Sequence, residues 1–575
     1  MLRPVYTEPE NCQDCYKCIR ECPVKAIKIE GNKAYIINER CVYCGHCTII
    51  CPTGAKKVRD GLTRARHIID RDPGRVYLSL APSYISEFPD ISDEELISAI
   101  KKLGFAGVSE TALGAEIVSA KTEAFLNSSP AGVYISSACP VVVGYILKYS
   151  EEHIECITPL ISPMLAHAKI LKELYGNDIK VIFAGPCIGK KSESDQFNNL
   201  INVAITFKDL RAWLESEGLY GSVTDIQDNP AEFIPYRSGF GTSYPIEGGM
   251  LTGMQKSRRK VHYMSFSDLY TIKEVLNDLE SKRKSDSIFI ELLACRGGCI
   301  NGPAKMNDTS IALKRYNIIK RYNPKGDTRK DFGHIDLYAD FNSDIQRGSQ
   351  NYSAMEIREA LLSIGKSLPE DELNCSSCGY DSCHDFAIAM LDGVAEYNMC
   401  ASYMRKIAHD KANVMLQKIP SGVVLVNSNM KILDMNRSFA AAMGEDTLEV
   451  YDICPGMDGA DFSKICPFEN LFRTVLITGE EIKERHIKMG ERTWLLSIYN
   501  IQTHKLIFGL LQDLQEPTVK KEWILEKTRD VIKDQMIMVQ KVAGLLGENA
   551  AFTDSSLRAI IEAYDTKKDE DKEEK

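Results

Sequence analysis

Apolar and polar positions follow different periodicities in different parts of the chain. Short apolar runs at 76–80 and 180–184 are typical of buried strands, and stretches such as 93–103 have helical spacing. Strands that alternate with helices predict an α/β domain over residues 59–345. Polar sequence at 316–350 loosens this pattern, so we place a domain boundary there.

The back half of the chain has the periodicity of short strands. Apolar runs at 421–426 and 431–435 predict a hairpin, because a polar turn separates them. Asn436 can cap a helix that begins at Arg437, and Gly444 can end that helix. Two later apolar runs complete a small predicted antiparallel sheet, and they lie at 494–499 and 505–511.

The last segment predicts an amphipathic helix over 517–550, where apolar residues recur at three-to-four spacing. We expect its apolar face to pack on a second chain and form a homodimer. The tail at 551–575 ends in KKDEDKEEK, which contains no apolar residue, so we expect it to be disordered.

Size and charge exclude several kinds of protein. A chain of 575 residues exceeds one hydrophobic core and indicates about three to five domains. The net charge of -10 and the lack of a dense basic stripe argue against nucleic-acid binding. No apolar run approaches the roughly 18–20 residues that span a bilayer, and the opening MLRPVYTEPE lacks the apolar stretch of a signal peptide. We therefore expect a cytoplasmic protein without membrane or nucleic-acid partners.

Nineteen cysteines indicate metal or redox chemistry, because the cytoplasm keeps thiols reduced and structural disulfides rare. Eight of them form two copies of the x2-x2-x3 spacing followed by proline, which is the run of bacterial ferredoxins. The copies are Cys12, Cys15, Cys18 and Cys22 before Pro23, and Cys41, Cys44, Cys47 and Cys51 before Pro52.

This doubled spacing predicts a ferredoxin-like domain over 1–58 with two 4Fe-4S clusters. Three close thiolates hold one cluster, and the fourth reaches across to the other. The first cluster would be bound by Cys12, Cys15, Cys18 and Cys51, and the second by Cys22, Cys41, Cys44 and Cys47. CxxC pairs also bind structural zinc, but the doubled run disfavours zinc. We place His46 at the surface.

Three loops of the central domain supply four more cysteines. Each loop is bounded by Gly or Pro and follows an apolar run, so the cysteines would converge on one soft-metal site. The loops are 136–140 with Cys139, 185–193 with Cys187, and 291–302 with Cys295 and Cys299. In this order they resemble the three signature motifs of FeFe-hydrogenases, and the resemblance covers the ferredoxin-like domain and the domain to about residue 345.

The resemblance implies an H-cluster, which is a 4Fe-4S cubane linked to a diiron subcluster bearing CO, cyanide and an amine-containing dithiolate. The four central cysteines would hold the cubane, and Cys299 would bridge to the diiron unit. Lys190 and the segment with Pro82 and Ser83 match family positions near cyanide, and Glu193 belongs to the motif of Lys190. A buried ammonium beside an anionic ligand satisfies both charges.

An alternative for these loops is a structural 4Fe-4S site without the diiron unit, as in eukaryotic hydrogenase-like proteins. The cysteines alone fit both interpretations. Lys190, Pro82 and Ser83 favour the complete H-cluster.

The chain departs from high-turnover members of the family at Ala138, where those members have a cysteine that passes protons. A methyl group has no proton to transfer. Thr158 could retain a hydroxyl relay, and the segment 115–125 offers Lys121, Thr122 or Glu123 as a channel group.

The surroundings of the diiron unit also differ from the family pattern. Two methionines of the family are replaced by Gly185 and Leu293, and the third motif ends in Gly302, Pro303 and Ala304. Loss of a positioned acid or base typically lowers a rate by about 10²–10⁴-fold. We therefore predict slow H2 turnover at an intact metal site, which suits a detector.

A third cysteine set lies in a small helical module at 350–410. It has the spacing Cys375-x2-Cys378-x4-Cys383-x16-Cys400, which resembles the 4Fe-4S module of corrinoid iron–sulfur proteins and sensory hydrogenases. Zinc is the alternative ligand. Its place between domains suits an electron outlet.

Residues 411–516 resemble a PAS domain in the order and length of their elements, and a plain dimerisation module is the alternative. No histidine follows His504, so the output would pass to a separate kinase, phosphatase or regulator. Cys156, Cys454 and Cys466 lie outside the ligand sets, and we interpret them as ordinary thiols, with a redox pair at Cys454 and Cys466 as the alternative.

These features together indicate a multidomain α/β and α+β protein, a sensory FeFe-hydrogenase that converts H2 reversibly to two protons and two electrons. Its expected partners are H2, a redox protein such as ferredoxin, and hydrogenase maturation proteins. The two alternatives are a ferredoxin-coupled hydrogenase enzyme and a non-catalytic iron–sulfur scaffold.

Overall fold

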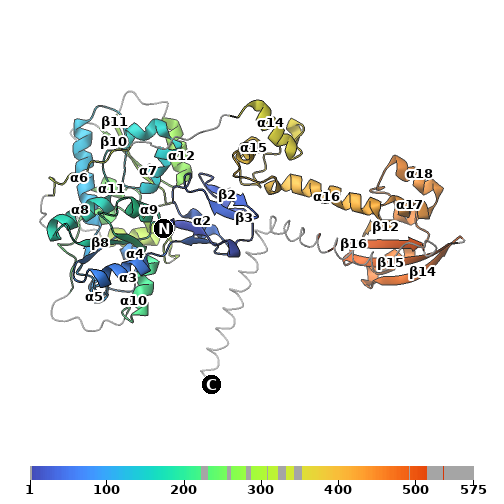
Figure 1. The fold of residues 1–575 in the computed structure, drawn as a ribbon, viewed down its shortest axis with the longest axis horizontal. Helices are drawn as coiled ribbons and strands as arrows, with labels where there is room; N and C mark the ends of the chain where they lie inside the picture. Colours follow the sequence, from blue (N-terminus) through green and yellow to red (C-terminus); the bar gives the residue numbers. More distant parts are fainter. Residues whose placement is uncertain are drawn as a thin grey trace, which may run out of the picture. The chain divides into compact units, whose positions relative to one another are not determined.

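The computed structural model describes residues 3–221, 231–254, 261–279, 287–306, 308–321, 332–341, 352–490 and 492–513, and the isolated positions 532 and 535. It divides into two compact units, Met1–Glu396 and Tyr397–Lys575 (Figure 1). Each unit has its own hydrophobic core.

The first unit begins with two small antiparallel sheets. Strands β1 (Val5–Thr7) and β4 (Lys56–Val58) pair with each other, and so do β2 (Ile27–Glu30) and β3 (Lys33–Ile36). The β1–β4 pair joins the two ends of the predicted ferredoxin-like domain. Two short helices start inside the two cysteine runs, and they are α1 (Lys17–Arg20) and α2 (His46–Ile50).

A four-stranded parallel sheet forms the centre of the first unit. Its order is β6 (Gly107–Glu110), β5 (Val76–Leu80), β8 (Lys180–Gly185) and β9 (Val203–Thr206). The strands predicted at 76–80 and 180–184 are thus confirmed, and the structure pairs them directly with each other. Their residues are almost all buried, as expected of parallel strands covered by helices on both faces.

A three-stranded parallel sheet lies in the same unit, in the order β10 (Val261–Ser267), β11 (Ser287–Leu293) and β7 (Val133–Ile135). Helices connect and cover the strands of both sheets (Figure 1). They are α3 (Leu62–Arg71), α4 (Tyr84–Glu87), α5 (Asp93–Lys102), α6 (Ala112–Ser128), α7 (Pro140–Tyr149), α8 (Pro163–Tyr175), α9 (Gly189–Gln196), α10 (Phe207–Ser216), α11 (Gly249–Gly253), α12 (Leu269–Leu279) and α13 (Ile311–Arg321).

Helix α5 shows why the sequence forms these elements. Ser92 caps it by accepting a hydrogen bond from the backbone N–H of Glu95, and the Glu95 carboxylate accepts one from the Ser92 N–H. Its buried positions recur at helical spacing, so the helix predicted at 93–103 is confirmed with an end one residue earlier, at Lys102.

The predicted polar break at 316–350 is only partly confirmed. Helix α13 continues through this stretch to Arg321, and Ile318 on it is completely buried. Phe332, Ile335 and Leu337 then join the central core. The helix carries many charged residues on its outer face, so its few buried apolar residues give only a weak signal in the sequence pattern.

The first unit ends with α14 (Ala354–Ser363) and α15 (Cys383–Leu391), which pack on each other. The helical stretch was expected to end near residue 410. In the second unit, helix α16 runs over Ala401–Lys418, so the stretch continues further than expected.

A five-stranded antiparallel sheet dominates the second unit. Its order is β13 (Ile432–Met435), β12 (Gly422–Asn427), β16 (Leu506–Asp513), β15 (Arg492–Gln502) and β14 (Ile482–Met489). The predicted hairpin and the two later strands are confirmed, whereas β14 was missed. Three helices accompany the sheet, and they are α17 (Arg437–Met443), α18 (Glu445–Ile453) and α19 (Glu469–Thr478).

Asn436 caps α17 as predicted, because its side-chain oxygen accepts a hydrogen bond from the Phe439 N–H at 2.9 Å, and Gly444 ends the helix. The helix predicted at 517–550 lies outside the described residues except for positions 532 and 535, and the tail lies wholly outside them. No helix among the described residues has the length and apolar character to cross a membrane.

Candidate functional site

The central cysteine loops all follow the carboxyl ends of parallel strands. Cys187 comes directly after β8, Cys139 follows β7, and Cys295 follows β11. The segment with Pro82 and Ser83 comes directly after β5. In open α/β sheets this edge is where ligands bind, because loops from neighbouring strands meet there.

The four central thiols lie within electrostatic reach of one another. Burial raises the pKa of Cys299, and Cys187 and Cys139 add to this rise. Burial likewise raises the pKa of Cys295, with contributions from the other three thiols, and that of Cys187 to about 11. Buried thiolates need a positive partner, so this cysteine set suits a bound metal centre.

Ser83 has the property expected of a residue that contacts a bound ligand. Its side chain is 1% exposed, and its hydroxyl oxygen has no hydrogen-bond partner among the described residues. Buried polar atoms are nearly always hydrogen-bonded. Pro82 beside it is buried as well. The donor that cyanide would need is therefore available in this loop.

Lys190 lies on the first turn of α9, directly after the Cys187 loop. Its Nζ donates to Ser162 Oγ at 2.8 Å and pairs with Glu193 at 2.7 Å. It also contributes electrostatically at Cys187 and Cys299, lowering the pKa of both thiols against the larger effect of burial. Glu193 thus neutralises the ammonium that would face the cluster.

The predicted proton-relay residues are only partly brought together. The Ala138 N–H donates to Ser136 Oγ at 3.3 Å, and the buried Thr158 hydroxyl lies 3.3 Å from Ser137 Oγ. Ser137 Oγ donates to the Leu160 carbonyl at 2.6 Å. Hydroxyl groups are therefore present around Ala138, although its own side chain has none.

The alternatives on α6 differ in what their side chains already contact. The Thr122 hydroxyl donates to the Val118 carbonyl of its own helix at 2.7 Å. Lys121 donates to the carbonyl of Gly333. Glu123 is half-buried, and burial raises its pKa. Glu123 is therefore the member of this group whose chemistry best suits a proton carrier.

Phe183 occupies the space beside Gly185. A Cβ on Gly185 would lie 2.7 Å from Phe183 Cζ and 3.1 Å from Ala81 Cβ. Leu293 is buried in the adjacent core cluster. An aromatic side chain from the same strand thus fills part of the volume where the family pattern has a longer side chain.

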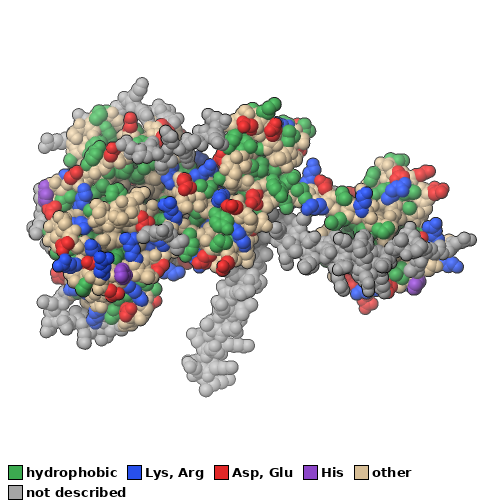
Figure 2. Space-filling model, in the orientation of Figure 1, with side chains coloured by type: hydrophobic (Ala, Val, Ile, Leu, Met, Phe, Trp, Pro, Cys, Tyr) green, Lys and Arg blue, Asp and Glu red, His purple; other side chains and the backbone are tan. Residues whose placement is uncertain are grey.

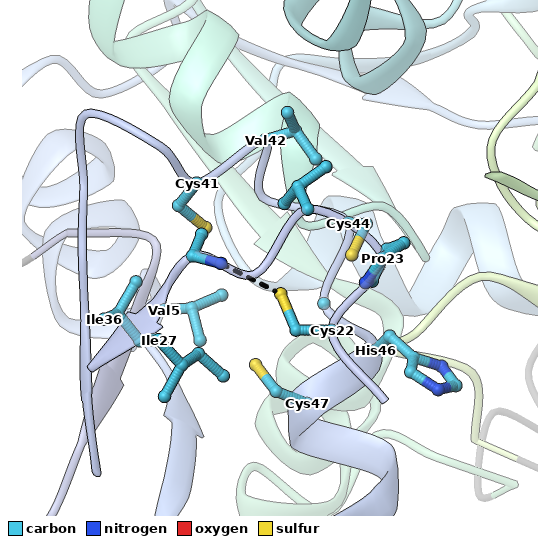
Figure 3. Close-up of a pocket in the computed structure, with 13 residues that line it drawn as sticks. Val5, Cys22, Pro23, Ile27, Ile36, Cys41, Val42, Cys44, His46 and Cys47 are labelled. Atoms are coloured by element: carbon cyan, nitrogen blue, oxygen red, sulfur yellow. Dashed lines mark hydrogen bonds between the residues drawn. The ribbon is translucent and has the colours of Figure 1, made fainter. Parts of the chain in front are cut away.

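The second ferredoxin-type ligand set lines one hollow (Figure 3). Cys22, Cys41, Cys44 and Cys47 surround it together with apolar side chains, and the ring of His46 points away from the sulfurs. The Ala26 N–H donates to Cys22 Sγ at 3.3 Å. Burial raises the pKa of Cys41 to about 11 and that of Cys44 to about 12. The hollow therefore fits a 4Fe-4S cluster.

The first ligand set also gathers. Burial raises the pKa of Cys18 to about 12, and Cys15, Cys12 and Cys51 each add to this rise. Among the residues that the structure describes, no group of three or more His, Cys, Asp or Glu is arranged around a single metal ion. The doubled cysteine spacing is what favours 4Fe-4S clusters over zinc at both ligand sets.

Contacts join the ferredoxin-like part to the central site. A Cβ on Gly45 would lie 2.5 Å from Ile188 Cδ1 and 2.7 Å from Pro303 Cβ, so only glycine fits between these side chains. Cys44, the residue before Gly45, contributes to the electrostatic environment of Cys295. The second ferredoxin cluster site is therefore the neighbour of the central site.

The third cysteine set is split by the boundary between the two units. Cys375 is exposed and Cys378 and Cys383 are half-buried in the first unit, whereas Cys400 belongs to the second unit. Its assignment as one ligand set remains a prediction.

A buried ion pair beside the site has no signal in the sequence pattern. Lys314 on α13 contacts Glu87 on α4, and both side chains are almost fully buried. Glu87 also accepts a hydrogen bond from the Met306 N–H at 2.6 Å, and Lys314 reaches the Ile300 carbonyl at 3.4 Å. The pair links the Ser83 segment to the turn that carries Cys299.

Glu110, at the carboxyl end of β6, should make the stability of the first unit depend on pH. Burial raises its pKa from 4.5 to about 7, although it accepts a hydrogen bond from the Ser238 N–H at 2.6 Å. A carboxyl with a raised pKa stabilises the fold below its unfolded pKa, and this stabilisation is lost as pH rises through the folded value.

We therefore expect the unfolding free energy of the wild type to fall by about 3 kcal/mol between about pH 4.5 and pH 7.5 as Glu110 ionises. The Glu110→Gln variant cannot ionise at this position and should not show this decrease. Calorimetric unfolding of both proteins across this range measures it, with the exposed Glu274→Gln as control. Parallel pH profiles of wild type and Glu110→Gln would contradict the assignment.

The cysteine sites define the chain as an iron–sulfur protein. Residues 74–303 match the family model "Iron only hydrogenase large subunit, C-terminal domain", and residues 6–55 match the "4Fe-4S dicluster domain". A third model, "Putative Fe-S cluster", matches residues 371–402. By these matches residues 74–303 form a domain similar to that of iron-only hydrogenases, with a dicluster ferredoxin domain before it and a further iron–sulfur module after it.

Individual relatives match shorter parts. An uncharacterized ferredoxin of Methanocaldococcus jannaschii is 44% identical over 46 residues, which are 8% of this chain and 74% of that ferredoxin. A ferredoxin of Methanothermococcus thermolithotrophicus is 33% identical over 48 residues, which are 8% of this chain and 80% of that ferredoxin.

A variant of the FeFe-hydrogenase HydA1 from Chlamydomonas reinhardtii is a similar solved structure, with 15% identity and a TM-score of 0.36, covering 46% of this chain and 89% of that one.

Proposed function

We propose that this protein is a sensory FeFe-hydrogenase, which reacts slowly and reversibly with H2 and passes the electrons through its iron–sulfur clusters to a signalling domain. The observation that carries the proposal is Ala138 beside an otherwise complete set of predicted ligands. A degraded enzyme would be expected to lose ligands as well as the relay. Here the ligands, Lys190 and Ser83 remain while the proton donor is absent.

The residues of the pocket have separable tasks in this proposal. The H-cluster, when bound, supplies the chemistry that splits H2 into two protons and two electrons. Lys190 and Ser83 are the residues that would hydrogen-bond its anionic ligands, and Glu193 holds the Lys190 ammonium in place. Ala138 holds no transferable proton, so protons would leave the site slowly. The state formed by reaction with H2 would then last longer.

The second unit would carry the output. We propose that residues 411–516 are a PAS domain, and that it acts with the segment 517–550, predicted from the sequence to be helical, on a kinase, phosphatase or regulator in a cytoplasmic homodimer. Asn436 supports mechanical coupling, because its Nδ2 donates to the Leu416 carbonyl at 3.0 Å and its Oδ1 accepts from the Val423 N–H at 2.8 Å. A change at helix α16 would thus reach strand β12 directly.

Infrared spectroscopy of the full chain, reconstituted with the diiron subcluster, tests the proposal. We expect carbonyl and cyanide bands under argon, a shift of these bands under H2, and slow H2-dependent dye reduction. The substitution Cys299→Ser should abolish the bands, because Cys299 is the residue that the family resemblance implies would link the protein to the diiron unit. Cys156→Ser is the matched control, because Cys156 is a buried cysteine outside every predicted ligand set.

Each other outcome has a defined meaning. Brisk dye reduction would contradict the sensory role and favour a ferredoxin-coupled enzyme. Absence of bands in protein that has been exposed to the maturation proteins would favour a scaffold without the diiron unit.

A further inference from the structure

Lys56 is a buried lysine of the ferredoxin-like domain that no site described above uses. It begins β4, where it lies opposite Thr7 of β1, and it is only 4% exposed. Its Nζ donates to Thr7 Oγ1 at 2.7 Å and to the Ala34 carbonyl at 2.9 Å. Both acceptors are neutral, and no carboxylate pairs with this ammonium among the residues that the structure describes. A buried charge is costly without a partner, so the negative groups around Lys56 must be of another kind.

The Lys56 ammonium lies within electrostatic reach of thiols from both ferredoxin-type ligand sets. Burial raises the pKa of Cys18, and the Lys56 charge opposes this rise. The same charge opposes the effect of burial on the pKa of Cys41 and of Cys47, which belong to the second set. At Cys51 of the first set, burial is outweighed by hydrogen bonds that include one from the Lys56 backbone N–H, and the pKa is lowered. The partners of this ammonium are therefore the cysteine ligands of both clusters.

The next residue of the same strand has the opposite environment. Lys57 pairs with Glu8 at 3.7 Å, and its side chain is 44% exposed. Successive residues of a strand point to opposite faces, which explains the difference. Strand β4 thus directs one lysine into the domain and the other to the surface.

A second lysine reaches the ferredoxin-like domain from the central domain. Lys148 lies in the last turn of α7, and its Nζ donates to the Cys41 carbonyl at 2.8 Å. It also opposes the effect of burial on the pKa of the Cys41 thiol. Lys148 therefore adds positive charge at the second ligand set.

We propose that these two lysines set the reduction potentials of the ferredoxin-type clusters, with Lys56 raising the potential of both and Lys148 that of the second cluster alone. Reduction adds one electron to a cluster and makes it more negative by one charge, while no bond breaks and no proton moves. A fixed positive charge nearby stabilises the reduced state, and net charge is one of the factors that determine iron–sulfur potentials. The inference concerns only the ferredoxin-type clusters and does not require H2 to react at the central site.

Redox titration of the full chain, loaded with its 4Fe-4S clusters and followed by electron paramagnetic resonance, tests the inference. The two signals are assigned by their loss in Cys15→Ser and in Cys44→Ser. Lys56→Met should lower the ratio of reduced to oxidised cluster at a fixed solution potential by about tenfold at both clusters, which is about 59 mV for a one-electron couple. Lys148→Met should lower this ratio by about two- to fivefold at the second cluster only, because Lys148 is half-buried and solvent screens its charge.

Three further variants separate the charge from the contacts of Lys56. Lys57→Met removes a lysine from the same strand and is the matched control, so both potentials should remain at their wild-type values. Lys56→Arg keeps the charge and should stay close to wild type. Lys56→Gln keeps a hydrogen-bond donor but no charge, and it should behave like Lys56→Met. Iron content is determined for every variant.

Unchanged potentials in Lys56→Met and Lys56→Gln with full iron content would overturn the inference, and so would an equal shift in Lys57→Met. If neither uncharged variant of Lys56 loads its clusters, Lys148→Met decides, because Lys148 lies outside the ferredoxin-like domain. An unchanged potential of the second cluster in that variant would then overturn the inference. The titration uses a chemical reductant and mediator dyes in place of H2, so its outcome is independent of the infrared test of the proposed function.

Discussion

The substitution Ala138→Cys is expected to raise the rate of H2-dependent dye reduction by about 10²–10⁴-fold, the usual contribution of a positioned acid or base. Ala138 is partly buried, and its N–H is hydrogen-bonded to Ser136, so a thiol at this position would start from a fixed backbone. Ser137, the residue before Ala138, has a buried hydroxyl, and the buried Thr158 hydroxyl lies 3.3 Å from it. A steady-state dye assay on the reconstituted protein measures the change.

The control for this experiment is Ala138→Val, which adds bulk but no transferable proton. It should leave the rate at or below the wild-type value. If Ala138→Cys keeps its infrared bands and its rate does not rise, the missing thiol is not the reason for slow turnover. The proton exit must then be interrupted further out, at α6.

The second large effect concerns stability. Lys314→Met should lower the unfolding free energy of the first unit by about 3–5 kcal/mol, because it leaves the Glu87 carboxylate buried without its cation. The Met306 N–H would remain its partner but cannot neutralise it. Thermal or denaturant unfolding followed by circular dichroism gives the difference.

The double substitution Glu87→Gln with Lys314→Met separates charge from packing. It removes both charges, so most of the lost stability should return, since neutral replacements of buried pairs are often tolerated. If the double variant is as unstable as Lys314→Met alone, the loss arises from packing around the lysine stem. Reduced iron content in the single variant would show that the pair also positions the Cys299 turn.

Local sequence pattern was sufficient where neighbours in the chain determine the structure. The buried strand at Val76–Leu80, the capped helix after Asn436 and the cysteine runs all depend on residues within one element or one loop. Strand β14 escaped prediction for a physical reason. It is an edge strand with mostly exposed charged residues, and edge strands often carry charge that prevents unwanted pairing.

Contacts between distant segments could not be predicted. Glu87 and Lys314 are 227 positions apart, and Arg40 and Asp392 are 352 apart. Each looks like an ordinary surface charge in the sequence, because burial is decided by the packing of whole elements. Ser83 was singled out only through the family resemblance, since a serine after a strand is common, and the lack of a hydrogen-bond partner for its hydroxyl among the described residues was not predicted.

The attachment of the central cysteine loops to two separate sheets bears on how the protein is made. Backbone hydrogen bonds and apolar cores hold each sheet, and no cysteine of the ligand sets takes part in the strand pairing of the described residues. The frame can therefore fold first and receive iron afterwards. If the proposed function holds, a cell could keep a reserve of folded chains without clusters, and the supply of inserted clusters, more than the rate of translation, would set how strongly it responds to H2.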